Sequence, residues 1–323
     1  MVPDRNGADS SSIDKGFFYP CVTYFAGELL SSAVMGDTVD EQKPMTQQPG
    51  EIKAPSLAEM QAIARKLRRH IVTMIGRVSS GHPGGSLSAV EIVSTLYFRV
   101  LRHNPRDPQW PDRDRFILSK GHAAPLLYAT LAECGYFPVE ELSTLRKLDS
   151  RLQGHPDRTL LPGVEMTAGS LGQGLSFATG VALAGRLDSK SYQVYVLLGD
   201  GECDEGQVWE AAMAAAHFKL DNLVAIVDRN ELQIDGWTCD VMGLEPFNSK
   251  WSSFGWHVIE ADGHDFTRLE EAFDQARMVK GQPTVIIART TKGKGVSYME
   301  NNADFHGKAP TPEQVEIALR ELE

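Results

Sequence analysis

Strand-like and helix-like segments alternate through the second half of the chain, and this alternation limits the possible folds more than any other feature. Four apolar runs have the length and composition of buried strands: 193–198, 223–228, 257–261 and 284–288. Two segments between these runs, 205–218 and 269–278, have apolar residues at helical spacing. This rhythm predicts a doubly wound α/β fold, in which a mainly parallel sheet carries helices on both faces. Ligands of such sheets bind at the carboxyl ends of the strands.

The first half of the chain contains two candidate helix starts. Ser56 with Glu59 forms a capping box, and Ser88 with Glu91 forms another. Residues 1–50 are polar and show no sustained periodicity, so we expect a flexible tail there and one domain over 51–323. Further helical patterns cover 175–186 and 312–322.

Charge and cysteine content restrict the partners and the compartment. The 32 basic and 43 acidic side chains give a net charge of −11, which argues against a nucleic acid partner. The four cysteines form neither a CxxC pair nor a disulfide framework, so we expect a reducing, cytoplasmic location. Pro20, Gly27 and Glu28 interrupt the only signal-like stretch, 17–35, which argues against a membrane span.

Oxygen ligands follow two of the predicted strands. Asp200 lies between Gly199 and Gly201 after the strand at 193–198, and Asn230 follows the strand at 223–228. With a nearby backbone carbonyl, these oxygens could hold Mg²⁺ against a diphosphate, because Mg²⁺ prefers hard oxygen ligands and often shares them with phosphates. On these two fragments alone, an ordinary turn is the simpler interpretation.

A glycine-rich segment, Gly169-Ser-Leu-Gly-Gln-Gly174, precedes the predicted helix at 175–186. The amides at a helix start carry the positive end of the helix dipole, which suits a phosphate. The glycine spacing differs from the dinucleotide-binding fingerprint. Close helix packing would explain these glycines equally well.

Four histidines lie next to glycine in polar loops: His82, His122, His155 and His306. Such turns expose an imidazole, and imidazole can transfer protons near neutral pH. None of the four pairs with another His or Cys at zinc-ligand spacing. The remaining histidines lack this context and are interpreted as structural or surface residues: His70, His103, His217, His257 and His264.

In this order along one chain, the segments resemble the transketolase family over roughly residues 55–310. The matching motifs are Ser-Gly-His-Pro-Gly-Gly at 80–85, Leu-Ser-Lys-Gly-His-Ala-Ala-Pro-Leu-Leu-Tyr at 118–128, Gly-His-Pro at 154–156, the Leu161–Gly174 segment, Gly-Asp-Gly at 199–201, and Asp-Arg-Asn-Glu-Leu-Gln-Ile-Asp-Gly at 228–236. The resemblance implies a thiamine diphosphate-binding fold of the diphosphate (PP) type over 51–323. The chain departs mildly from the family at two positions. The family often has a proline where Ser170 stands, and often an asparagine or aspartate where Arg229 stands.

The resemblance also implies roles for individual residues. Asp200, Asn230 and the carbonyl of Leu232 would bind Mg²⁺, with Ca²⁺ or Mn²⁺ as substitutes. The residues along thiamine diphosphate would be His122, Gly169, Leu171, Gly201, Glu205, Asn230 and His306. His82, His155 and His306 would face the sugar as catalytic residues. Glu205 and Glu210 match an acidic pair near the subunit interface of the family.

The chemistry implied is transfer of a two-carbon ketol unit from a ketose phosphate to an aldose phosphate, as in the pentose phosphate pathway. In the family, the glutamate that activates the aminopyrimidine ring lies in a second domain, beyond the part matched here. We therefore expect a C-terminal transketolase subunit with the pyrimidine-binding domain as partner. Two copies of each chain would form a heterotetramer, and the chain alone would be inactive.

Three alternatives remain open at the level of sequence. The α-subunit of a 2-oxo-acid dehydrogenase shares the Gly-Asp-Gly to Asn pattern, but the loop histidines argue against it. The corresponding part of a deoxyxylulose-phosphate synthase would differ in decarboxylating pyruvate. A non-catalytic regulatory subunit could keep the fold alone.

Overall fold

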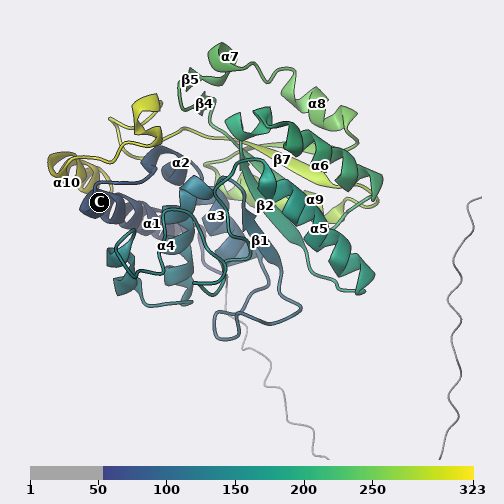
Figure 1. Cartoon of the computed structure of the whole chain (residues 1–323), viewed down its shortest axis with the longest axis horizontal. Helices are drawn as coiled ribbons and strands as arrows, with labels where there is room; N and C mark the ends of the chain where they lie inside the picture. Colours follow the sequence, from purple (N-terminus) through teal and green to yellow (C-terminus); the bar gives the residue numbers. More distant parts are fainter. Residues whose placement is uncertain (1–53) are drawn as a thin grey trace, which may run out of the picture. The chain divides into compact units, whose positions relative to one another are not determined.

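The computed structural model describes residues 54–323, so the predicted flexible tail lies outside the described residues. Five parallel strands form the main sheet in the order β1-β2-β3-β7-β6 (Figure 1). Their bounds are Arg115–Leu118, Val194–Gly199, Leu223–Arg229, Thr284–Arg289 and His257–Asp262, in that order across the sheet. The sheet is thus fully parallel, and all five carboxyl ends lie at one edge.

Alternate residues of each strand enter two different hydrophobic cores. Tyr195 and Leu197 of β2 contribute to one core, whereas Val194, Val196 and Leu198 contribute to the other. Because successive side chains of a strand point to opposite faces, both faces of the sheet are buried. The prediction of a doubly wound fold is therefore confirmed.

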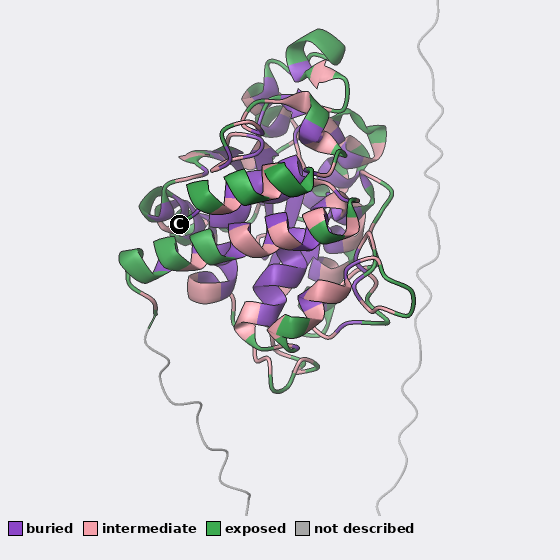
Figure 2. Cartoon of the chain, turned by 90° about the vertical axis from the view of Figure 1, so that its left-hand side faces the viewer, coloured by how far each residue is buried: buried purple, intermediate pink, exposed green. Residues whose placement is uncertain are grey.

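Helices cover each face. The first core includes residues of α1 (Leu57–Val78), α2 (Pro83–Ser88), α3 (Val90–Thr95), α4 (Ala124–Cys134), α9 (Phe266–Met278) and α10 (Pro312–Glu321). The second includes residues of α5 (Gln173–Leu187), α6 (Gly206–His217) and α8 (Phe247–Ser253). Figure 2, viewed from the side of α1 and α10, shows exposed residues along the outer sides of the nearest helices and buried residues behind them.

Short elements complete the fold. A small antiparallel hairpin, β4 (Leu232–Gln233) and β5 (Gly236–Trp237), precedes α7 (Thr238–Val241). A π-helical segment, Leu96–Val100 (η1), follows α3 directly, and short 3₁₀ helices occur at Gly121–Ala123 (η2), Val139–Thr144 (η3), Gly201–Asp204 (η4) and Ala303–His306 (η5). Within residues 54–323, no helix combines the length and apolar character that crossing a bilayer requires.

One of the two helix-start predictions is confirmed and the other is wrong. Ser56 caps α1, and its box with Glu59 is formed in both directions. Ser88 is instead the last residue of α2, and its hydroxyl donates to Asp228 at 2.5 Å. Glu91 is engaged by the guanidinium of Arg68 at 2.6 Å, so no carboxylate is free to close the second box.

Candidate functional site

Neighbouring strand ends bring four polar side chains to one place. Lys120 follows β1, Asp200 follows β2, Asn230 follows β3 and Lys292 follows β7. The parallel register pairs Gly199 with Asp228, which sets the residues after β2 and β3 side by side. All four side chains line one pocket, named here the β2–β3 pocket. The predicted site residues that line it are His122, Leu171, Asp200, Gly201, Asn230, Leu232 and His306.

Asp200 is buried, with 1% of its surface exposed. Its carboxylate accepts from the amide of Gly201 at 2.8 Å and from the amide of Glu231 at 2.5 Å. Burial and the nearby Asp228 carboxylate raise the pKa of Asp200 to about 6. The guanidinium of Arg229 lies 3.5 Å from this carboxylate but also pairs with Glu245, so it compensates the charge of Asp200 only in part. A bound cation would stabilise the ionised form of Asp200 further.

Asn230 and Leu232 supply the other two predicted oxygens. The side-chain oxygen of Asn230 accepts from the Leu232 amide at 3.2 Å, and its nitrogen donates to Asp228 at 3.1 Å. The carbonyl of Leu232 accepts from the ammonium of Lys292 at 2.8 Å. A carboxylate, an amide oxygen and a backbone carbonyl form the hard donor set that Mg²⁺ prefers. The residues present thus fit a metal that shares its shell with phosphate.

The two buried lysines were not singled out in the sequence. Lys120 is paired with Asp228, which also accepts from Ser88 and Thr290. The pKa of Asp228 is lowered, because Lys120 and these hydroxyls outweigh its burial. Lys120 is therefore held in position by a carboxylate that is already saturated with donors.

Lys292 has no such carboxylate in contact. Its ammonium contacts the Leu232 carbonyl and Nδ1 of His306, each at 2.8 Å, and both groups are neutral. Burial and the charge of Lys120 lower the pKa of Lys292 to about 8. A dianionic ligand between the two ammonium groups would relieve this repulsion.

All four loop histidines meet in one cluster. The ring centroid of His82 lies 5.4 Å from that of His122, 6.2 Å from that of His155 and 5.6 Å from that of His306. His122 and His306 are 5.0 Å apart. The cluster adjoins the β2–β3 pocket, because two of its members line the pocket.

The imidazoles of the cluster are neutral at physiological pH. Burial, aided by Arg146, His155 and Lys292, lowers the pKa of His82 to about 4. Burial and Lys292 lower the pKa of His306 to about 3. Burial also lowers the pKa of His122 and His155. Nδ1 of His82 is buried and has no protein partner within the described residues, so it can serve a ligand.

The glycine-rich segment before α5 has a different role from phosphate binding at the helix start. The buried carboxylate of Glu202 accepts from the amide of Gly172 at 2.9 Å, and Ser119 accepts from the amide of Gly174 at 3.2 Å. A Cβ on Gly174 would clash with the side chain of Ser119. These two glycines therefore serve close packing and internal capping, and Leu171 is the residue of the segment that reaches the pocket.

Gly169, Glu205 and Glu210 lie away from the pocket lining. Gly169 is exposed, and a Cβ there would be 3.8 Å from the ring of His155. Glu205 and Glu210 are exposed, before and within α6. The roles assigned to these three residues remain predictions.

The other histidines lie outside the cluster. His103 is held by Tyr136 and the Tyr97 carbonyl, and His264 lies 2.9 Å from Glu91. His217 is exposed. In the described part of the chain, no group of three or more His, Cys, Asp or Glu side chains could hold a metal. A zinc-type site is accordingly not found there. The predicted Mg²⁺ ligands are a different kind of set, because only one of them is an acidic side chain.

Known proteins share both the sequence and the fold. The family model described as "Transketolase, thiamine diphosphate binding domain" matches residues 59–322. The 6-deoxy-6-sulfo-D-fructose transketolase subunit SqwG of Clostridium sp. is 46% identical over 82% of this chain and 96% of its own length. An apulose-4-phosphate transketolase subunit of Actinobacillus succinogenes is 44% identical over 83% of this chain and 97% of its own length.

Solved structures agree with these matches. A transketolase from Campylobacter jejuni aligns with a TM-score of 0.79 and 34% identity, over 83% of this chain and 43% of that chain. A Pichia stipitis transketolase in complex with sedoheptulose 7-phosphate aligns with a TM-score of 0.78 and 35% identity, over 81% of this chain and 40% of that chain. The chain thus spans less than half of these single-chain enzymes but nearly the full length of the subunits. It belongs to the transketolase family, and it contains the thiamine diphosphate binding domain of that family.

Proposed function

We propose that this chain is the diphosphate- and metal-binding subunit of a two-chain, Mg²⁺-dependent transketolase. One observation carries the proposal: two buried ammonium groups and three candidate oxygen ligands line the β2–β3 pocket, and a cluster of four neutral imidazoles adjoins it. The relatives compared above are named as transketolases. The dehydrogenase and deoxyxylulose-phosphate synthase alternatives gain no support from them.

The diphosphate and its metal would be held by strand-end residues. Asp200, Asn230 and the Leu232 carbonyl would supply the metal ligands, with Ca²⁺ or Mn²⁺ as possible substitutes. Lys120 and Lys292 would neutralise the remaining phosphate charge. Gly201 would let the backbone approach the ligand, because glycine has no Cβ. A Cβ there would also come within 2.9 Å of the side chain of Gln233.

The histidines would handle the protons of the sugar. When bound, thiamine diphosphate supplies the carbon nucleophile that takes up the ketol unit. A neutral imidazole can accept a hydroxyl proton or donate its own N–H to a carbonyl oxygen, and the lowered pKa values keep these rings neutral. His82, His155 and His306 would act on the sugar, while His122, which lines the pocket, would lie beside the cofactor.

The substrates would be anionic sugars. The two subunits described above are named for sugars that carry a sulfonate or a phosphate. Burial lowers the pKa of His82 and of His155, and the nearby Arg146 adds to this effect, so one positive charge lies close to these two imidazoles. We infer a ketose phosphate or sulfonate as donor and an aldose phosphate as acceptor, within carbohydrate metabolism of the pentose phosphate type.

A C-terminal transketolase subunit carrying the pyrimidine-binding domain would complete the site. Beside the pocket, the β4–β5 hairpin and α7 present exposed apolar side chains: Ile234, Trp237, Val241 and Met242. Exposed apolar groups gathered on one short segment are typical of contact surfaces. Glu205 and Glu210 are also exposed and available to a partner. A closed symmetric assembly with two copies of each chain is the simplest arrangement.

A reducing compartment is consistent with the thiols. Cys134, Cys203 and Cys239 are free cysteines, and no disulfide joins any of the residues from 54 to 323. We therefore propose a cytoplasmic location.

The proposal is tested by assaying ketol transfer with thiamine diphosphate, Mg²⁺, an anionic ketose donor and an aldose phosphate acceptor. We expect no turnover by the chain alone and robust turnover after addition of a pyrimidine-domain subunit. Turnover by the isolated chain would contradict the two-chain assignment. No turnover by the mixture across a broad sugar panel, with cofactor bound, would favour a regulatory subunit.

A further inference from the structure

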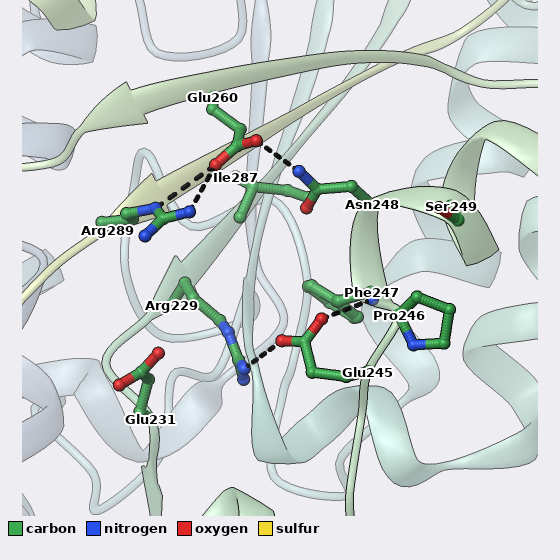
Figure 3. Close-up of a pocket in the computed structure, with 10 residues that line it drawn as sticks. All are labelled: Arg229, Glu231, Glu245, Pro246, Phe247, Asn248, Ser249, Glu260, Ile287 and Arg289. Carbon is green, nitrogen blue, oxygen red and sulfur yellow. Dashed lines mark hydrogen bonds and ion pairs between the residues drawn. The ribbon is translucent and has the colours of Figure 1, made fainter.

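Arg229 lies between the β2–β3 pocket and a second pocket at the same edge of the sheet. This second pocket, named here the arginine pocket, includes Arg229, Glu245, Glu260 and Arg289 among its lining residues (Figure 3). Both guanidinium groups are already paired there: Arg229 with Glu245 at 2.8 Å and Arg289 with Glu260 at 2.8 Å. An anionic ligand would have to displace a glutamate, so the arginine pocket is a poor binding site.

The contacts of Arg229 point to a different role. Its side chain is only 10% exposed, and one end of the guanidinium lies 3.5 Å from Asp200. The same end donates to the Thr238 hydroxyl at 3.3 Å, while the other end binds Glu245. The planar group also lies over the ring of Phe247, at 5.4 Å from its centre. Arg229, at the end of β3, therefore connects Asp200 with Thr238 in the middle of the segment 231–246 and with Glu245 near its end.

That segment forms one wall of the β2–β3 pocket. Leu232, Gln233 and Ile234 line the pocket, yet most of the residues from 235 to 246 are exposed. Its own backbone closes only a two-residue-per-strand hairpin, which is not stable by itself. The segment depends on contacts with the rest of the domain to keep Leu232 in place.

We propose that Arg229 and Glu245 form a clasp that fastens the 231–246 segment against Asp200, so that the wall of the cofactor pocket is formed before the cofactor binds. Arg229 is thus a positioning residue, at a position where the family often has Asn or Asp. Glu245 holds the far end of the clasp, because its second oxygen accepts from the Phe247 amide at 2.8 Å. The consequence for cofactor affinity rests on the function proposed above, whereas the consequence for the segment does not.

The arginine pocket contains a matched control. The Arg289–Glu260 pair has the same length and faces the same pocket, but its arginine is 73% exposed and contacts neither Asp200 nor the segment. Figure 3 shows the two pairs on separate sides of the pocket. Each substitution therefore removes one ion pair from the arginine pocket, but only the Arg229–Glu245 pair belongs to the clasp.

The first measurement is amide hydrogen exchange over residues 231–246 in the full chain without cofactor. Arg229→Met should speed exchange in this segment about ten-fold, and the exposed Glu245→Gln about five-fold, the size expected for one partly exposed ion pair. The double variant should resemble Arg229→Met, because both changes break the same contact. Arg289→Met and Glu260→Gln should leave the segment unchanged.

The second measurement is the concentration of thiamine diphosphate and Mg²⁺ needed for half-maximal activity of the assembled enzyme. Clasp variants should raise it about five- to ten-fold, while kcat at saturation stays within about two-fold. Arg229→Lys should rescue only in part, because an ammonium cannot span the Asp200 and Glu245 sides at once.

Parent-like exchange in both Arg229→Met and Glu245→Gln would overturn the clasp, and so would an equal response in the Arg289 control. Additive effects in the double variant would contradict a shared contact. Failure of the unsubstituted enzyme to bind thiamine diphosphate would count against the proposed function. The hydrogen-exchange measurement would still test the clasp, because it uses the chain without cofactor.

Discussion

The β2–β3 pocket and the arginine pocket open at the same carboxyl edge of one parallel sheet, but their charges are matched differently. In the arginine pocket, each guanidinium contacts a glutamate. In the β2–β3 pocket, Lys292 is buried against neutral groups, while Asp200 is buried next to a second carboxylate and shares the Arg229 guanidinium, 3.5 Å away, with Glu245. The charges of the arginine pocket are matched within the protein, whereas those of the β2–β3 pocket would be stabilised further by an anionic ligand and a cation.

Topology alone therefore does not define a binding site. Strand ends concentrate polar residues along the whole edge of the sheet. What distinguishes the β2–β3 pocket is the set of pKa values displaced by burial, since the histidines, Lys292 and Asp200 all depart from their ordinary values. Each prediction below tests this distinction by pairing a change in the β2–β3 pocket or the histidine cluster with a control.

The largest effect is expected from Asp200→Ala. Loss of the one charged metal ligand should abolish Mg²⁺-dependent retention of thiamine diphosphate, with affinity reduced by about 100-fold or more. Calorimetry on the assembled protein measures this, with Glu260→Ala in the arginine pocket as control. Equal binding by the Asp200 variant and its parent would show that the metal site is wrongly assigned.

His155→Ala should lower turnover about 100-fold in the assembled enzyme while cofactor affinity changes little, because this imidazole is proposed to act on the sugar and does not line the β2–β3 pocket. Steady-state rates at saturating cofactor, together with calorimetric titration, separate the two effects. His217→Ala, an exposed histidine on α6, is the control and should behave as the parent. Unchanged turnover in His155→Ala would show that His155 has a structural role and does not act in catalysis.

Lys292→Met should weaken thiamine diphosphate binding about ten-fold or more, since it removes a charge-assisted contact from a buried ammonium. Lys294→Met is the matched control, because that side chain is 40% exposed and lies 3.4 Å from Glu300. Equal affinities in the two variants would mean that the unmatched charge of the pocket does not serve the diphosphate.

The smallest effect concerns stability in acid. The folded pKa values of His82 and His306, about 4 and about 3, lie below the unfolded value of 6.5. Between pH 6.5 and these values, the unfolded chain binds protons that the folded chain does not, so stability falls as the pH falls. Asp200, with its raised pKa, opposes this trend equally in parent and variant.

The double variant His82→Gln, His306→Asn should therefore show a shallower loss of stability between pH 7 and pH 5. Urea unfolding midpoints at the two pH values provide the test. A slope identical to that of the parent would show that these imidazoles are not buried in the neutral form.

The sequence predicted four of the five strands of the sheet but missed β1, and it predicted the helix starts less well. The strand runs at 193–198 and 223–228 match β2 and β3 to within one residue, because continuous apolar stretches leave little ambiguity. The box at Ser88 was wrong because a cap pattern does not reveal which tertiary partner takes each group. Here Asp228 accepts from Ser88, and Arg68 binds Glu91.

The site shows the same limit. The oxygen ligands and the loop histidines were predicted, because their types and glycine contexts are visible along the chain. Lys120 and Lys292 were missed, because a lysine is ordinarily exposed and these two are separated by most of the domain. Only the strand order, which sets β1 and β7 on either side of β2 and β3, brings them to one edge. For the amides before α5, phosphate binding and close packing were both open at the level of sequence, because Glu202, which accepts from the Gly172 amide, comes from a later segment.

We infer that incompletely matched buried charge, not position at the sheet edge alone, marks the cofactor site. A structure of the assembled protein with thiamine diphosphate and Mg²⁺ tests it most directly. We predict the diphosphate between Lys120 and Lys292, with the metal bound by Asp200, Asn230 and the Leu232 carbonyl. A diphosphate in the arginine pocket, or a metal bound without Asp200, would contradict the account.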